Sequence, residues 1–259
     1  MHADPYTGPQ RSTASDVVPP SSQAPGVNAM TSIAQRIADS LKLLESTLKP
    51  ARRIVHAGDV LYRTGERFEH LYVLNLGCFK LVSVTEDGHE QVVGLKFRGD
   101  WLGFGGIATG TYACDAIAMD TAEVWAIRYD ALLRACAEHP SLMALLHEAM
   151  SAEIMRDREA KTALCTLPAD ARVATFLHDW AASLAVRGLR TDQISLRLTR
   201  AEIGNYLGLT LETVSRVLSK LAKSRLIVFN GKSRRDICIP DFEALAAYTG
   251  RRPATVNLH

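Results

Sequence analysis

The sequence predicts an α+β fold in which an antiparallel β-roll is followed by one long helix and a small C-terminal domain. Between residues 53 and 129, short runs of β-branched and aromatic residues alternate with turn signals such as EDGHE and ATGT. Residues 140–165 then follow a helical pattern, and a second pair of helix signals with a hairpin signal comes after residue 196. We expect a tail over 1–29, a β-roll domain with a leading helix over 30–138, the long helix over 139–166, the C-terminal domain over 167–250 and a tail over 251–259.

The first 29 residues contain five of the ten prolines, which predicts a disordered tail. The following segment, 31–49, has apolar residues at helical spacing and is predicted to be a helix that ends before Pro50. Hydrophobic residues make up 47% of the chain, but no run is long enough to span a membrane and no signal peptide is visible. A cytoplasmic protein without membrane contact is therefore expected.

The segment 140–165 is predicted to be one helix, because it has no glycine or proline after its start. At 1.5 Å per residue it would be roughly 38 Å long. A stripe of apolar side chains on such a helix can pack on a partner helix across a dimer seam or on the core of its own domain. The stripe consists of Leu142, Leu145, Leu146, Ala149, Met150 and Ile154.

Two short helices separated by a turn are predicted between residues 199 and 223. Thr199 and Glu202 have the spacing of a capping box, so a helix should begin near Arg200. Gly208 supplies the backbone freedom that a tight turn needs, and Thr210 can cap a second helix that continues to about Lys223. This arrangement predicts a helix-turn-helix.

The second of these helices has one apolar and one polar face. Leu211, Val214, Leu218 and Leu221 form the apolar face, whereas Glu212, Ser215, Arg216 and Ser219 form the polar one. An arginine can bond bidentately to guanine, a glutamate can accept from cytosine N4, and hydroxyls such as those of Ser215 and Thr213 can bond to bases or phosphates. The polar face therefore suits the major groove of DNA.

A β-hairpin is predicted after the second helix, with Asn230-Gly231 as a type I′ turn signal. Its cations would face phosphates, as in a wing. Residues 187–236 hold eleven Lys and Arg against four Asp and Glu, although a solvated charged face or an ordinary helical hairpin would also fit. The candidate DNA-binding residues are Thr210, Glu212, Thr213, Ser215, Arg216, Lys232, Arg234 and Arg235.

At TRAEIGNYLGLTLETVSRVLSKL the sequence resembles the CRP/FNR family of transcription regulators, in its FNR-like branch. The resemblance covers roughly residues 35–250 and implies a β-roll sensor domain of the cyclic-nucleotide-binding type, a dimerisation helix and a winged helix-turn-helix. It places the family's base-contacting residues on Glu212, Ser215 and Arg216. It also implies a homodimer, a palindrome of TTGAT-type half-sites, and an activator that contacts RNA polymerase.

Where the resemblance predicts ligand contacts in the β-roll, this sequence departs from the cyclic-AMP pattern. The positions of the glutamate for the ribose and of the arginine for the phosphate hold Phe104 and Ala113. A phenyl ring cannot accept a hydroxyl hydrogen bond, and alanine cannot pair with a phosphate. Cyclic AMP is therefore not expected, whereas another cyclic nucleotide or a cyclic dinucleotide remains an alternative.

The chain also lacks the cysteines of the family's [4Fe–4S] cluster, because residues 1–77 contain none and the fourth falls near Trp125. We expect no cluster, no other cofactor and no metal site, with a haem-based or thiol-based sensor as alternatives. Cys114 is the first candidate for a thiol switch because its loop should be exposed. No GxSxG, P-loop or HExxH motif is present, so no enzyme is expected.

The resemblance also places Ile154 and Asp157 in the dimer seam. Two carboxylates that face each other across a two-fold axis repel, which would weaken the dimer and allow a switch. Alternatively, Asp157 is solvated and pairs with Arg156 or Arg158. The candidate interface residues are Leu142, Leu146, Met150, Ile154 and Asp157.

Overall fold

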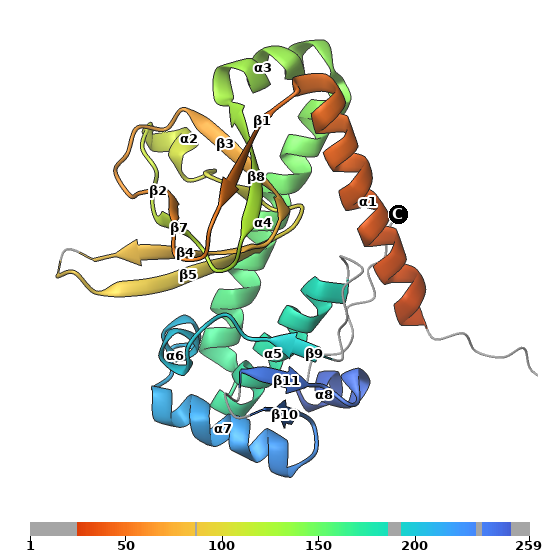
Figure 1. Cartoon of the computed structure of the whole chain (residues 1–259), viewed down its shortest axis with the longest axis vertical. Coiled ribbons are helices and arrows are strands. Elements are labelled where there is room, and N and C mark those ends of the chain that lie inside the picture. Colours follow the sequence, from red (N-terminus) through yellow and green to blue (C-terminus); the bar gives the residue numbers. More distant parts are fainter. Residues whose placement is uncertain (1–24, 86, 186–192, 232–234, 250–259) are drawn as a thin grey trace, which may run out of the picture.

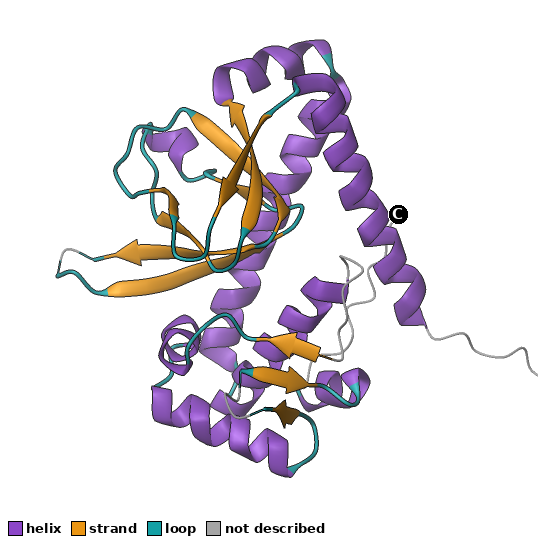
Figure 2. Ribbon diagram, viewed as in Figure 1, coloured by secondary structure: helices purple, strands orange, loops and turns teal. Residues whose placement is uncertain are grey.

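The computed structural model describes residues 25–85, 87–185, 193–231 and 235–249. Figure 1 shows the β-roll at one end, the small C-terminal domain at the other, and the long helix α4 running between them. The predicted fold class is therefore confirmed. Figure 2 shows most of the strands gathered in the β-roll, whereas the C-terminal domain consists mainly of helices. Within the described part of the chain, the helices are too short or too polar to cross a membrane.

The β-roll consists of two four-stranded antiparallel sheets, with the strand orders β1-β8-β3-β6 and β2-β7-β4-β5. The predicted runs HLYVLNLG, CFKLVSVT, EQVVGLKF and AEVWAIRY form β3, β4, β5 and β8. The strands are β1 (Ala51–Val55), β2 (Val60–Tyr62), β3 (His70–Leu76), β4 (Cys78–Val84), β5 (Glu90–Phe97), β6 (Trp101–Leu102), β7 (Asp115–Ala118) and β8 (Ala122–Arg128).

Helices cover one end and one face of the roll. The leading helix α1 (Pro25–Leu48) ends before Pro50 as predicted, but it begins inside the segment assigned to the tail. The chain then passes through α2 (Gly106–Thr109) and α3 (Tyr129–Glu138) into α4 (Pro140–Thr166), which is the predicted long helix.

Two cores stabilise this half of the molecule. One lies between the sheets and includes Leu74, Phe79 and Val124. In the other, α1, α3 and α4 pack on the outer face of β3 and β8. Leu142 and Leu146 belong to this second core and are 0% and 5% exposed, which corrects their assignment to a dimer seam. The first turns of α4 bury their apolar stripe against the chain's own domain.

The C-terminal domain forms a third core around α5 (Ala169–Ala185), α6 (Arg200–Leu207) and α7 (Leu211–Lys223). A three-stranded sheet in the order β10-β11-β9 and a last helix α8 (Phe242–Tyr248) complete it. The strands are β9 (Gln193–Ser195), β10 (Val228–Asn230) and β11 (Asp236–Cys238).

The hairpin after α7 is present, but its turn differs from the predicted one. Asn230 is a strand residue that pairs with Asp236, so the chain connects the two strands through residues 231–235 rather than through a two-residue turn. Only Gly231 of the predicted pair has a positive φ, whereas a type I′ turn needs two such residues. β9, which pairs with β11, had no signal in the sequence.

Candidate nucleic-acid interface

The two helices of the helix-turn-helix begin as their capping residues predict. The side-chain oxygen of Thr199 accepts a hydrogen bond from the Glu202 backbone N–H (3.2 Å), and the Thr199 N–H donates to the Glu202 carboxylate (2.7 Å). This capping box satisfies two N–H groups that have no partner inside the helix. It fixes the position at which α6 starts.

The turn between the two helices depends on two glycines. Gly208 ends α6 in the left-handed region, with φ of 61°, where a side chain would be strained. A Cβ atom on Gly204 would lie 2.5 Å from the carbonyl oxygen of Leu209. Because both positions exclude a side chain, the backbones of α6 and of the turn can approach closely, which sets the angle between the helices.

Helix α7 buries one face in the domain core through Val214, Val217, Leu218 and Leu221. Thr210 caps this helix, because its hydroxyl accepts from the Thr213 N–H (3.2 Å) and donates to the Thr213 hydroxyl (3.1 Å). Leu211 was predicted on the buried face but is 46% exposed, since it lies in the first turn before the helix reaches the core.

The opposite face of α7 brings together three of the predicted base-contacting residues. Glu212 and Arg216 are exposed, and Ser215 is half-buried between them at the spacing of neighbours on a helix surface. Figure 1 shows α7 at the end of the molecule, on the side of α6 away from the β-roll. A carboxylate, a hydroxyl and a guanidinium are thus presented on one open surface.

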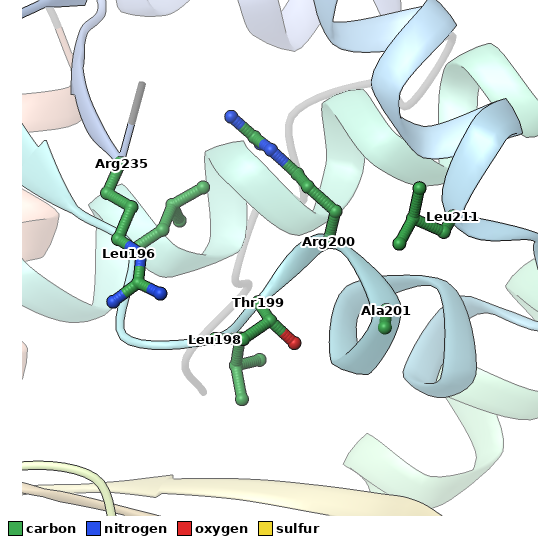
Figure 3. Close-up of a pocket in the computed structure, with 7 residues that line it drawn as sticks. All are labelled: Leu196, Leu198, Thr199, Arg200, Ala201, Leu211 and Arg235. Atoms are coloured by element: carbon green, nitrogen blue, oxygen red, sulfur yellow. The ribbon is translucent and has the colours of Figure 1, made fainter. Parts of the chain in front are cut away.

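A hollow of about 280 Å³ lies beside the first turn of α7 (Figure 3). Arg235, which directly precedes β11, and Arg200, the first residue of α6, both line it. The Arg200 guanidinium lies 5.7 Å from the centre of the Phe229 ring. Sequence analysis missed Arg200, although a cation in the first turn of α6 was visible there. Lys232 and Arg234 lie outside the described residues.

Comparisons with known proteins agree with this geometry. Residues 171–248 match the model of the Crp-like helix-turn-helix domain, and residues 52–139 match that of the cyclic nucleotide-binding domain. The chain is 34% identical over 199 residues to the fumarate and nitrate reduction regulatory protein of Salmonella typhimurium, covering 77% of this chain and 78% of that protein. The chain belongs to the CRP/FNR family of transcription regulators.

Other CRP/FNR regulators give the same result. The fumarate and nitrate reduction regulatory protein of Escherichia coli strain K12 is 33% identical over 199 residues, which are 77% of this chain and 78% of that protein. The solved structure of FixK2 from Bradyrhizobium japonicum has a TM-score of 0.68 at 26% identity and covers 76% of this chain and 96% of FixK2. The helix-turn-helix of this CRP/FNR regulator is accordingly its DNA-binding element.

The second half of α4 has an exposed stripe that is apolar at both ends and charged between them, formed by Ile154, Asp157, Lys161 and Leu164. Ile154 and Leu164 are 50% and 42% exposed, and Asp157 lies exposed between them. Met150, one turn before Ile154, is half-buried and packs on the β-roll core. Arg156, one of the two predicted partners of Asp157, pairs instead with Asp100 (3.2 Å) and Glu153 (2.9 Å).

Aromatic side chains of the chain itself pack in the interior of the β-roll. The rings of Tyr62 and Tyr112 stack with their centroids 4.0 Å apart, and the Tyr112 hydroxyl donates to the His70 carbonyl (2.9 Å). Burial raises the pKa of both phenols, so these tyrosines are neutral. Deeper towards α4, the ammonium of Lys96, 3% exposed, pairs with the carboxylate of Glu153.

The residues at the positions of the family's ligand contacts do not suit cyclic AMP or a [4Fe–4S] cluster. Phe104 stacks on Trp101 (5.8 Å), and Ala113 has no group for a phosphate. The five cysteines lie on separate elements, and in the described ranges no three His, Cys, Asp or Glu side chains come together as metal ligands. Among the described residues, the cysteines therefore do not gather into a ligand set of the [4Fe–4S] type.

The surroundings of Cys114 disfavour the thiolate form that a thiol switch needs. Burial raises the pKa of the Cys114 thiol to about 11, although nearby Lys96 acts in the opposite direction. A thiol with this pKa is almost entirely protonated at neutral pH and reacts slowly with oxidants. Cys165, near the C-terminal end of α4, is the exposed cysteine of the described part.

Proposed function

We propose that this regulator binds double-stranded DNA as a homodimer, on a palindrome of TTGAT-type half-sites. The observation that carries the proposal is the grouping of Glu212, Ser215 and Arg216 on the open face of a capped helix. Arg216 can donate two hydrogen bonds to guanine O6 and N7, and Glu212 can accept from cytosine N4. Arg200 and Arg235 would face phosphates beside the groove.

The proposal of a homodimer rests on α4. Its exposed apolar residues Ile154 and Leu164 lie ten residues apart, at two positions that can face a partner helix in a coiled-coil seam. A two-fold axis along this stripe would bring the same residues of two chains together, as an isologous interface requires. Two recognition helices would then enter successive major grooves on one side of the DNA. By analogy with the family, RNA polymerase is the expected second partner, in the cytoplasm.

Fluorescence anisotropy with three DNA duplexes tests this proposal. One carries the palindrome, the second has one half-site scrambled, and in the third the half-sites are five base pairs further apart. Since a mismatched base pair costs about 1–3 kcal/mol, we expect the palindrome to bind at least 100-fold more tightly than the other two. Equal affinity for the palindrome and the single half-site would contradict dimeric recognition.

The match to a cyclic nucleotide-binding domain supports a second candidate, a nucleotide receptor that uses the same fold. The stacked tyrosines and the Lys96–Glu153 pair favour a roll that does not take up cyclic AMP. A thermal-shift assay with a panel of cyclic nucleotides and dinucleotides separates the two, because a ligand at 100 times its Kd adds about 2.7 kcal/mol. We expect no shift with cyclic AMP, and a saturable shift would support the receptor.

A further inference from the structure

The first helix of the helix-turn-helix is bonded to the β-roll through one asparagine. The Asn205 side chain accepts a hydrogen bond from the backbone N–H of Val92 (2.6 Å) and donates one to the backbone carbonyl of Glu90 (2.7 Å). Both groups belong to β5, the last strand in the order of its sheet. A carboxamide carries a donor and an acceptor side by side, so it can pair with a strand edge as a neighbouring strand would.

Two further polar contacts join α6 to the same sheet, one from β5 and one from the neighbouring strand β4. The Gln91 amide donates to the backbone carbonyl of Asn205 (2.6 Å), and Lys80 of β4 pairs with Glu202 of α6. Burial of the Glu202 carboxylate opposes its ionisation, but hydrogen bonds from Lys80 and Thr199 more than offset this, and the pKa of Glu202 lies below its usual value. The β-roll therefore contacts α6 through the Asn205 side chain, the Asn205 backbone carbonyl and the Glu202 carboxylate.

Movement of α6 cannot be separated from movement of α7. The two helices share a core through Ile203, Leu207 and Val214, and the tight turn at Gly204 and Gly208 fixes the angle between them. In Figure 1, α6 lies between β5 and α7. A bond between β5 and α6 therefore sets the direction in which Glu212 and Arg216 point.

We propose that Asn205 is a positioning residue for DNA recognition, which fixes the recognition helix relative to the β-roll and α4 by bonding the edge of β5. The inference rests on the proposed dimeric binding of a palindrome. Two recognition helices fit successive major grooves only when they are held about 34 Å apart. Within one chain this separation depends on how firmly the helix-turn-helix is fixed to the part that carries the dimer seam.

The test measures preference for half-site spacing rather than affinity alone. Full-length wild type, Asn205→Ala and Lys80→Met are titrated with palindromes of the natural spacing, with spacings changed by one and two base pairs, and with a single half-site. Lys80→Met weakens the contact from the β-roll side and leaves the helix-turn-helix sequence intact. Asn75→Ala removes a comparable asparagine hydrogen bond, to Glu123 inside the roll, and is the matched control.

For Asn205→Ala we expect affinity for the natural spacing to fall about tenfold, with single-half-site affinity unchanged, so that spacing discrimination is lost. Tenfold corresponds to about 1.4 kcal/mol, in the range expected for two hydrogen bonds. Lys80→Met should show a smaller change in the same direction, and Asn75→Ala none. Amide hydrogen exchange at Val92 should be faster in Asn205→Ala than in wild type.

Three results would overturn the proposal. Asn205→Ala could keep the wild-type preference for half-site spacing, or lose affinity equally for every DNA. Either outcome would mean that Asn205 acts only in local stability. Unchanged exchange at Val92 would mean that the bond does not form in solution. A wild type that binds a single half-site as tightly as any palindrome would overturn the proposed function itself, and the inference with it.

Discussion

The charged side chains of α7 are exposed to solvent, whereas the buried lysine of the β-roll is paired with a carboxylate of the same chain. Glu212 and Arg216 are exposed on α7, whereas the buried Lys96 of β5 pairs with Glu153 of α4, where the roll meets this helix. Charged side chains that bind a partner are solvated in the free protein. A buried charge, by contrast, needs a counterion in the same chain. The proposed DNA contacts would thus come from an open surface, whereas Lys96 already has its counterion within the chain.

The largest expected effect comes from opening the buried pair. In Lys96→Met, Glu153 loses its buried cation and keeps only Arg156, so we expect a loss of about 3 kcal/mol of unfolding free energy at pH 7. Urea unfolding measures it. Arg134→Met, which breaks an exposed pair with Asp130, is the control and should leave stability nearly unchanged, because solvent screens this pair.

The stability difference between wild type and Lys96→Met should also depend on pH. Burial alone would raise the pKa of Glu153, but the bonds from Lys96 and Arg156 lower it overall. Ionised Glu153 therefore stabilises the wild type above its unfolded pKa of about 4.3, and this contribution is lost as the pH falls through the lower, folded value. The difference between wild type and Lys96→Met should be largest at pH 7 and shrink below about pH 4. A pH-independent difference would contradict this role of Lys96.

On the open surface, Arg216→Ala should weaken specific binding by about 1–3 kcal/mol per half-site and relax the preference at one guanine. The control is Lys223→Ala, an exposed cation in the last turn of the same helix. It should weaken all sequences slightly and equally. Competition binding with every substitution at each position of the half-site separates the two. If both variants lose affinity without a change in preference, Arg216 contacts phosphate and not a base.

Asp157→Ala should strengthen the dimer by about 1 kcal/mol if the stripe of α4 is the seam. Two carboxylates about 6 Å apart at an effective dielectric near 20 repel by roughly 2–3 kcal/mol, and solvent and nearby arginines reduce this. Sedimentation over a concentration series gives the dimer constant. Glu159→Ala removes the same charge off the stripe and should leave that constant unchanged. An unaltered constant for Asp157→Ala would place this carboxylate in solvent.

The smallest effect is expected at the rim of the DNA surface. Arg235→Ala should lower the salt dependence of binding by about one unit per half-site, because one phosphate contact is removed. Its sequence preference should remain that of the wild type. Titrations at several salt concentrations measure the slope, and a changed base preference would show that Arg235 contributes to specificity.

How much could be predicted from sequence depended on whether the signal was local. Thr199, Glu202, Gly208 and Thr210 act within a few residues, so the start of each helix and the turn were predicted correctly. The sequence could not decide whether Leu142 and Leu146 pack in their own domain or in a dimer seam, because the deciding β-roll residues are more than ten positions away. Asn205 gave no signal at all, since its partners on β5 are 113 and 115 residues distant.

Selection of binding sites from random DNA by the full-length protein tests the central claim most directly, because it presumes neither the half-site nor the dimer. We expect an inverted repeat of a TTGAT-like half-site with centres one helical turn apart. The guanine of that half-site should lose its enrichment when Arg216→Ala is selected in parallel. Enrichment of a single unrepeated site, or of the same site by both proteins, would contradict recognition by a paired α7.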